Sequence, residues 1–155
     1  MEKKIRHLQS KDIVSYLPYN LKVLSTKWHE PMALVGVQGK LAYIDCLLDE
    51  ISTIKPILRP MRDLVTEIIV EGYNDNKPFV PLYHLAPIAF KFHKWNERFF
   101  LTISEECVTV NISCKNSDSI GIHCHIKLTV SRIDLLNQWH FDYRGLIEQD
   151  LAIEY

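Results

Sequence analysis

The sequence predicts an α+β fold, a single domain in which an antiparallel β-meander with one long hairpin packs against short helices. Its 155 residues, of which 47% are hydrophobic, suit one domain with a buried core. Residues 119–130 alternate between apolar and polar side chains, as a half-buried strand does. Segments suited to short helices lie on both sides of that region. We therefore expect one domain over residues 1–155, with a β-hairpin insert at about 98–130.

The N-terminal part of the chain predicts one short helix and three strands. Ser10 is suited to cap a helix over residues 11–17, and Pro18 is expected to end it. Apolar runs then indicate strands, and the pair Gln38-Gly39 is typical of the turn between two of them. The three strands are expected at residues 21–24, 32–37 and 40–45.

Two prolines, Pro56 and Pro60, organise the next segment. Each restricts the preceding residue to extended geometry, and Pro60 fits the first turn of a helix that continues to about Val70. The polar residues 72–78 are expected to form a loop, and residues 81–86 a second short helix. The helix after Pro60 is expected to bury Leu64, Val65, Ile68 and Ile69.

The long hairpin is the clearest signal in the sequence. From residue 119 to 130 every second side chain is apolar, and residues 108–113 alternate in the same way. The polar segment 114–119 between them is typical of a turn. Residues 98–103 favour a third antiparallel strand. One face of this sheet is therefore expected to be buried and the other to face the solvent.

The C-terminal residues predict a helix and a docked tail. Ser131, followed three residues later by Asp134, is typical of a helix start, and the helix is expected to end near Phe141. Gly145 permits a break in the chain. The tail that follows is apolar, so we expect it to pack on the domain through Leu146, Ile147, Leu151, Ala152 and Ile153.

Composition and motifs argue against an enzyme. The formal net charge of −1 does not indicate a generic nucleic-acid binder. Residues 36–40 lack the glycine spacing of a phosphate loop, and no hydrolase, zinc-protease or dinucleotide-binding signature is found. We predict no catalytic residue, no metal and no cofactor. We also expect no secretion leader and no membrane span, and we interpret the four cysteines as reduced thiols of a cytoplasmic protein.

His123 and His125 form the pair most suggestive of chemistry. Residues two apart on a strand share a face, so both imidazoles could hold one metal ion while Cys124 points into the core. Exposed histidines on the solvent face of a hairpin are the simpler interpretation. A metal site would need a further ligand, for which the sequence offers, without diagnostic spacing, Glu105, Glu106, Cys107, His84 and His93.

Residues 90–100 interleave basic and aromatic side chains. Lys91, Lys94 and Arg98 could contact phosphates while Trp95 stacks on a base. A half-buried loop or edge strand, with lysines that reach the solvent, has the same composition. The segment therefore leaves open both nucleic-acid binding and a purely structural role.

Residues 139–143 gather three aromatic side chains beside a histidine and an aspartate. His140 and Asp142 could form an acid–base pair, but no nucleophile is placed by spacing. Packing of Trp139 and Phe141 in the core, with His140 oriented at the surface, is favoured.

Several segments resemble a family of small, uncharacterised proteins of Bacteroidetes phages and prophages. The most specific strings are Lys-Pro-Ile-Leu-Arg-Pro at residues 55–60 and Trp-His-Phe-Asp-x-x-Gly-Leu-Ile-Glu at residues 139–148. The hairpin from Arg98 to Val130 is longer than the middle segment expected for that family. In chain order, the matching segments are residues 17–23, 54–64, 79–81, 135–148 and 151–153.

The resemblance implies an intracellular phage accessory protein that binds and blocks a host protein, in its sharpest form an inhibitor of a CRISPR-type defence nuclease complex. We therefore expect a non-enzymatic protein in the host cytoplasm whose partner is a host protein or a protein–RNA complex. The alternatives are a metal-binding hydrolase domain at His123 and His125, or direct RNA or DNA binding. The residues expected to carry binding are Lys91, Lys94, Trp95, Arg98, Thr109, Asn111, His123, His125 and Lys127.

Overall fold

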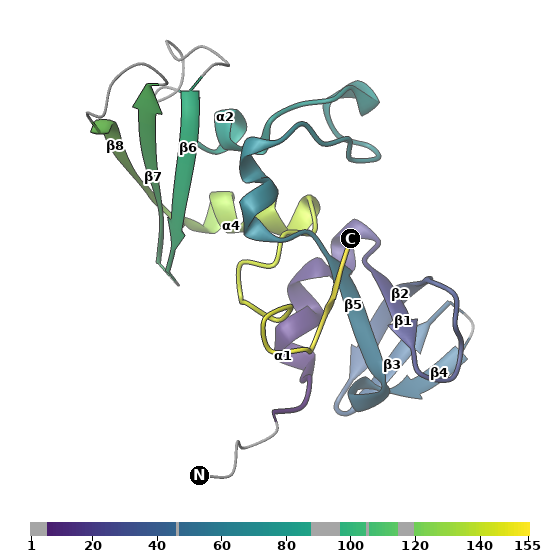
Figure 1. Cartoon of the computed structure of the whole chain (residues 1–155). Coiled ribbons are helices and arrows are strands. Elements are labelled where there is room, and N and C mark those ends of the chain that lie inside the picture. Colours follow the sequence, from purple (N-terminus) through teal and green to yellow (C-terminus); the bar gives the residue numbers. More distant parts are fainter. Residues whose placement is uncertain (1–5, 46, 88–96, 105, 115–119) are drawn as a thin grey trace, which may run out of the picture. The chain divides into compact units, whose positions relative to one another are not determined.

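A computed structural model of the chain shows short helices and mostly antiparallel strands, which confirms the predicted α+β class (Figure 1). The structure describes residues 6–45, 47–87, 97–104, 106–114 and 120–155, with the backbone alone at 97–100, 112–114 and 120–123. None of the helices in these ranges is long and apolar enough to cross a membrane.

The chain divides into two compact units, and each is described by itself. The barrel unit comprises Met1–Pro60 and Leu136–Tyr155, and the hairpin unit comprises Met61–Leu135. The single domain expected over residues 1–155 stays a prediction.

The barrel unit opens with helix α1 (Ser10–Ile13), which continues as the 3₁₀ helix η1 (Val14–Tyr19). The predicted helix is therefore present, but two details of the prediction are wrong. Ser10 is the first helical residue, because Gln9 holds the cap position. Pro18 lies inside η1 and does not end it, because the fixed φ of proline suits 3₁₀ geometry.

A six-stranded sheet forms the body of the barrel unit, and its strand order is β4-β3-β2-β1-β5-β9. All neighbouring pairs are antiparallel except β5 and β9. The turn between β2 and β3 contains Gly39, whose φ of 59° is readily adopted by glycine. The strands are β1 (Lys22–Ser25), β2 (Met32–Gln38), β3 (Leu41–Ile44), β4 (Leu47–Glu50), β5 (Ile54–Leu58) and β9 (Ile153–Glu154).

Strands β1 to β5 curl into a small, partly open barrel. Although β1 and β4 are separated by two strands in the sheet order, the Ser25 hydroxyl on β1 donates to the Asp49 carboxylate on β4 at 2.7 Å. The 3₁₀ helix η2 (Ile51–Thr53) leads from β4 back to β5. The curled sheet encloses an apolar core that includes Val23, Leu34, Ala42, Ile44, Ile51, Ile54 and Leu58.

Helix α4 (Val130–Gln138) begins one residue before the predicted start. It ends at Gln138, and His140, two residues further on, has a φ of 59° in the left-handed region. The Phe141 N–H donates to the Leu136 carbonyl at 2.8 Å, and the His140 N–H donates to the Asn137 carbonyl at 3.0 Å. This pair of bonds is a Schellman motif, which satisfies carbonyls at the helix end.

The C-terminal tail packs on the barrel unit, as predicted. Leu146, Leu151 and Ala152 are buried. Ile153 and Glu154 then form β9, which pairs in parallel with the edge of β5. The tail therefore adds both apolar burial and one short strand to the sheet.

The helix predicted from Pro60 to Val70 is wrong. Only the 3₁₀ helix η3 (Met61–Val65) forms, and Ile68 then pairs as an isolated antiparallel bridge with Phe79. Val65, Thr66, Ile68, Ile69 and Val70 are β-branched, which disfavours the helix. As a result Leu64 and Ile68 are buried as expected, whereas Ile69 is 56% exposed.

The loop and short helix predicted after this segment are both present. The loop contains the 3₁₀ helix η4 (Asn74–Asn76), and helix α2 spans Pro81–Leu85.

The predicted hairpin is confirmed as a three-stranded antiparallel sheet, β6 (Glu97–Ile103), β7 (Cys107–Cys114) and β8 (Ile120–Lys127). Val108, Val110 and Ile126 are buried on one side. The alternation read from the sequence therefore assigns these side chains and Leu128 to the buried face correctly. It is wrong at Val130, which is 86% exposed, because β8 ends at Lys127 and Val130 begins helix α4. Residues 115–119 of the predicted turn lie outside the described residues.

Candidate protein-binding surfaces

The outer face of β7 and β8 carries the predicted site residues that the structure brings together. Thr109 lies directly opposite His125, and its hydroxyl is 3.0 Å from the His125 Nδ1 atom. The next opposed pair is Asn111 and His123, of which His123 is described by its backbone alone. Lys127 is exposed at the end of β8. The hairpin thus presents a polar face, as predicted.

Most of the basic and aromatic residues at positions 90–100 lie outside the part of the chain that the structure describes. Lys91, Lys94 and Trp95 lie outside the described residues, and Arg98 is described only as a backbone position opposite Ser113. Nucleic-acid binding through this segment therefore stays a prediction.

The Trp-His-Phe-Asp segment is structural, as favoured from its sequence. Trp139 and Phe141 have no solvent exposure. The buried Asp142 carboxylate accepts from the backbone N–H groups of Leu146 at 2.8 Å and Ile147 at 2.7 Å. Its role is therefore to hold the chain as it enters the tail.

The His140 imidazole bonds to a backbone carbonyl, and the Asp142 carboxylate bonds to backbone N–H groups, so the hydrogen bonds of the two side chains lead to different parts of the chain. The His140 Nε2 atom lies 2.7 Å from the Tyr19 carbonyl oxygen. Burial lowers the pKa of His140, which favours the neutral ring. This hydrogen bond links the residues that follow α4 to Tyr19, the last residue of η1.

An exposed apolar face on β2, β3 and β4 was not predicted. Strand β3 has no polar residue, and its inward side chains, Ala42 and Ile44, are buried. We call the outward set the apolar face, and these residues keep a large fraction of their surface in solvent. The set comprises Val35 (63% exposed), Leu41 (37%), Tyr43 (40%) and Leu48 (54%).

Strand register assembles this face around Tyr43. Tyr43 lies opposite Gly36 on β2 and opposite Leu48 on β4. A Cβ atom on Gly36 would lie 3.7 Å from the Tyr43 ring, so the ring lies against the bare backbone of β2. The Tyr43 hydroxyl donates to Gln38 Oε1 at 2.8 Å, which fixes the ring orientation. A register shift between Leu34 and Gly36 accompanies the strong exposure of Val35.

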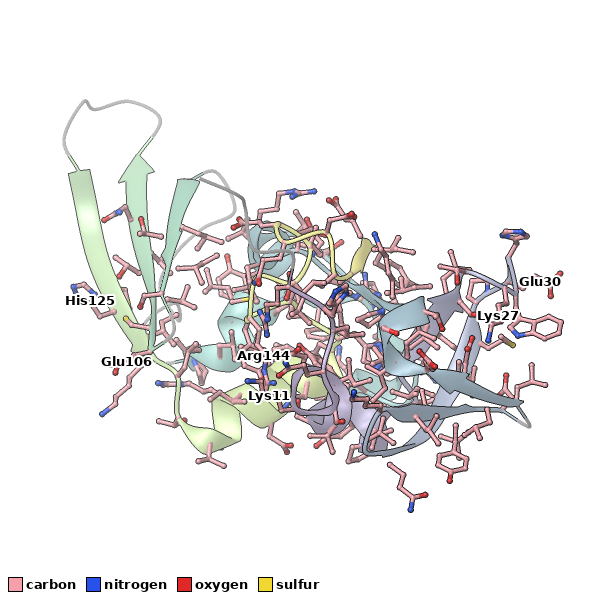
Figure 2. The ribbon with its side chains drawn as sticks, turned by 90° about the horizontal axis from the view of Figure 1, so that it is seen from below. Lys11, Lys27, Glu30, Glu106, His125 and Arg144 are labelled. Atoms are coloured by element: carbon pink, nitrogen blue, oxygen red, sulfur yellow. The ribbon has the colours of Figure 1, made fainter. Side chains whose placement is uncertain are left out.

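Asp49 on β4 points to the inner side of the sheet and anchors the strand through hydrogen bonds. Its carboxylate, 4% exposed, accepts from the Ser25 hydroxyl at 2.7 Å and from the Lys27 ammonium at 2.6 Å. Lys27 belongs to the loop between β1 and β2 (Figure 2). Burial alone would raise the pKa of Asp49, but hydrogen bonds from Lys27 and Ser25 outweigh it and lower the pKa to about 2. The neighbouring Leu48 is thereby held on the outer side.

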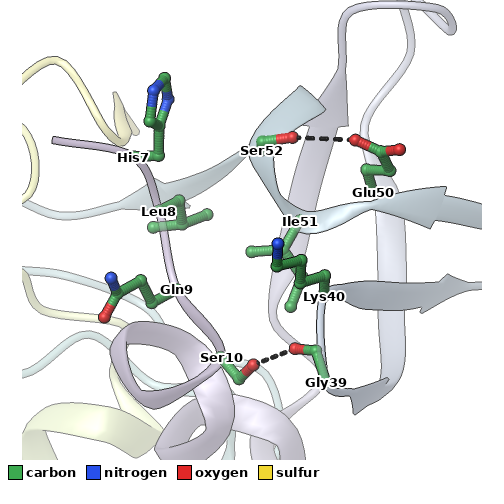
Figure 3. A pocket seen from close by; sticks show the side chains of 9 residues that line it. All are labelled: His7, Leu8, Gln9, Ser10, Gly39, Lys40, Glu50, Ile51 and Ser52. Carbon is green, nitrogen blue, oxygen red and sulfur yellow. Dashed lines mark hydrogen bonds between the residues drawn. The ribbon is translucent and has the colours of Figure 1, made fainter. Parts of the chain in front are cut away.

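A pocket of about 480 Å³ lies at one end of the barrel unit (Figure 3). Leu8 and Ile51 contribute apolar surface, and Lys40 and Glu50 contribute opposite charges. The Ser10 hydroxyl donates to the Gly39 carbonyl at 2.5 Å, and the Ser52 hydroxyl donates to Glu50 at 3.3 Å. His7 also lines the pocket, and neither of these hydroxyls is hydrogen-bonded to its imidazole.

The sequence contains a signal for the apolar face that a search for catalytic motifs does not use. A strand with one solvent face alternates in polarity, whereas Leu41-Ala42-Tyr43-Ile44 is apolar at every position. Such a strand is either buried on both faces or exposes an apolar one. Because nothing in the sequence reveals the sheet order, the choice between these requires the fold.

No protein-family model, no curated protein and no solved structure matches the chain.

Proposed function

We propose that the chain is a non-enzymatic binding protein that docks another protein on the apolar face of the barrel unit. The observation that carries this proposal is the exposure of four large apolar side chains on three adjacent strands. Contiguous apolar patches of this kind on a folded protein mark sites of protein–protein contact. Single exposed apolar residues carry no such meaning, because they are common on all protein surfaces.

The layout of the face resembles a small interface with an apolar centre and a polar rim. Tyr43 lies at the centre, with an oriented ring and a hydroxyl already bonded to Gln38. Aromatic side chains that are fixed before binding contribute strongly, because little conformational freedom is lost. Gln38 and Glu50, both exposed, lie opposite Leu41 and supply the rim. A fitting partner offers an apolar patch bordered by hydrogen-bond donors.

The resemblance to phage proteins supports the choice of partner. It favours a host protein, including a subunit of a defence nuclease complex, bound by occlusion and without chemistry on the partner. The polar outer face of β7 and β8, with Thr109, Asn111, His125 and Lys127, is a second surface available for contact.

The proposal is tested by affinity capture from the lysate of a Bacteroidetes bacterium with three forms of the chain. The wild type is expected to retain a stoichiometric partner protein. Leu48→Lys, which places an ammonium in the apolar face, is expected to weaken capture at least about tenfold, since a buried unpaired charge is costly. Matched circular-dichroism spectra and melting temperatures verify that the variant folds.

Val130→Lys is the matched control, because Val130 is an exposed apolar residue, 86% in solvent, on α4. It is expected to capture the partner as the wild type does. Equal capture by all three forms would contradict the proposed face, and the absence of any stoichiometric protein would contradict the proposed function.

A further inference from the structure

The pocket at the end of the barrel unit lies between two segments that are distant in the sequence. Residues 7–10, which lead into α1, form one wall, and Gly39, Lys40 and residues 50–52 form the other (Figure 3). The hydrogen bond from the Ser10 hydroxyl to the Gly39 carbonyl joins the two walls at one end. The volume of about 480 Å³ lies within the range of about 300–1,000 Å³ that is typical of small-molecule sites.

Both walls contribute an apolar side chain to the inner part of the pocket. Leu8 is 7% exposed and Ile51 is 2% exposed, and both belong to the core of the barrel unit. The other side chains of the lining are polar or charged, apart from Gly39. An apolar group that reaches Leu8 and Ile51 leaves water on both sides, which favours its binding.

Two opposite charges line the same wall without pairing. Lys40 follows the turn after β2, and Glu50 is the last residue of β4. The Ile51 N–H donates to the Lys40 carbonyl at 2.8 Å, which holds these two chain segments together. Within the described ranges the Lys40 ammonium has no ion pair or hydrogen bond, and the Glu50 carboxylate accepts only from the Ser52 hydroxyl, at 3.3 Å.

The ligand that complements this lining carries an anion, a cation and an apolar group. A carboxylate pairs with the Lys40 ammonium, and an ammonium pairs with the Glu50 carboxylate. Short peptides with free termini combine both charges with apolar side chains. Each residue separates the termini by up to about 3.5 Å, so a dipeptide suits two charges that lie too far apart to pair directly better than a single amino acid does.

We propose that this pocket binds a short zwitterionic peptide, with its carboxylate at Lys40 and its ammonium at Glu50. The apolar side chain of the peptide packs against Leu8 and Ile51. The site is separate from the apolar face, because none of the four residues of that face lines the pocket. It therefore goes beyond the proposed function, and the two proposals stand or fall separately.

The test is an NMR titration of the isotope-labelled full chain with the dipeptide leucyl-leucine. Saturable shifts are expected at the amides of residues 7–10, 39–40 and 50–52, with a dissociation constant on the order of 100 µM for a ligand of this size. The N-acetylated dipeptide lacks the ammonium, and the C-amidated dipeptide lacks the carboxylate. Each is expected to bind at least about tenfold more weakly, because one charge of the pocket loses its partner.

Variants of the two charged residues assign the ends of the peptide. Lys40→Met is expected to weaken binding of leucyl-leucine at least about tenfold and to leave the affinity for the amidated dipeptide unchanged. Glu50→Gln is expected to have the same effect on leucyl-leucine and to leave the affinity for the acetylated dipeptide unchanged. This pattern follows from two direct contacts, whereas a general disturbance of the fold would weaken all three ligands alike.

Lys22→Met and Glu30→Gln are the matched controls, because both residues are exposed, belong to the barrel unit and do not line the pocket. Both variants are expected to bind leucyl-leucine as the wild type does. The proposal is overturned if leucyl-leucine causes no saturable shifts, if the three ligands bind equally, or if the control variants lose as much affinity as Lys40→Met and Glu50→Gln.

Discussion

Asp49 shows how one inward side chain orients a strand. Its carboxylate is buried, accepts from Ser25 and Lys27, and also accepts from the backbone N–H of Glu50 at 2.9 Å. A buried carboxylate is tolerated only where such partners replace water. The adjacent Leu48 consequently faces outward, so a polar contact in the interior determines where the apolar face lies.

Replacing Asp49 by Asn is expected to lower the free energy of unfolding by about 1–2 kcal/mol at neutral pH, because charge-assisted hydrogen bonds become neutral ones. The pKa of about 2 in the folded state lies below the unfolded value near 4. The ionised form is therefore favoured by folding, and its stabilisation is complete above about pH 5 and is lost between about pH 4 and pH 2. Urea unfolding across that range measures both effects.

Asp150→Asn serves as the control for this experiment. Asp150 pairs with Lys55 at 2.5 Å, but its side chain is 91% exposed. Exposed pairs contribute little, so a change within about 0.5 kcal/mol is expected. If Asp49→Asn retains the acid sensitivity of the wild type, the assigned role of Asp49 is wrong.

Among the secondary-structure elements, the strands predicted from alternating polarity were more accurate than the helix predicted after Pro60. The alternation within residues 108–113 and 119–130 assigns both strands and the buried side chains of the described part, but it overruns the end of β8 at Lys127 and misplaces Val130. The helix predicted after Pro60 was wrong although the apolar residues of this segment fit a helical stripe. The segment is rich in β-branched residues, which favour extended backbone, and Ile68 forms a bridge with Phe79. That bridge depends on a residue 11 positions away along the chain, which local periodicity does not detect.

The corrected pattern predicts opposite outcomes for two adjacent isoleucines. Ile68 is 6% exposed and Ile69 is 56% exposed. Ile68→Ala is expected to cost about 2–4 kcal/mol of unfolding free energy, and Ile69→Ala less than about 1 kcal/mol. Denaturant titrations of the two variants measure the difference. Equal, large losses would favour the helix that the sequence predicted.

The sequence predicted one candidate surface and missed others, because it reveals features along a single strand but not contacts between strands. The polar face with Thr109 and His125 follows from alternation along single strands, so the sequence was sufficient. The pocket depends on the contact of residues 7–10 with the turn between β2 and β3, and the apolar face depends on the order of β2, β3 and β4. Both are relations between separate segments of the chain, and composition and motifs do not encode them.

The two units of the molecule present different kinds of surface. The barrel unit encloses an apolar core and still leaves an apolar face in solvent, while the hairpin unit shows a polar face. Binding through the apolar face is expected to depend weakly on salt, because apolar contact involves no release of counterions. Nucleic-acid binding through basic residues would weaken steeply as salt increases.

Site-specific photocrosslinking identifies the surface of the chain that contacts the partner protein. A photoreactive phenylalanine analogue at position 43 would lie at the centre of the apolar face, and the same analogue at position 130 would lie on the exposed side of α4. In host lysate, position 43 is expected to yield one dominant crosslinked protein, which position 130 does not yield. Crosslinks from position 130 with none from position 43, or crosslinks to nucleic acid alone, would contradict the account.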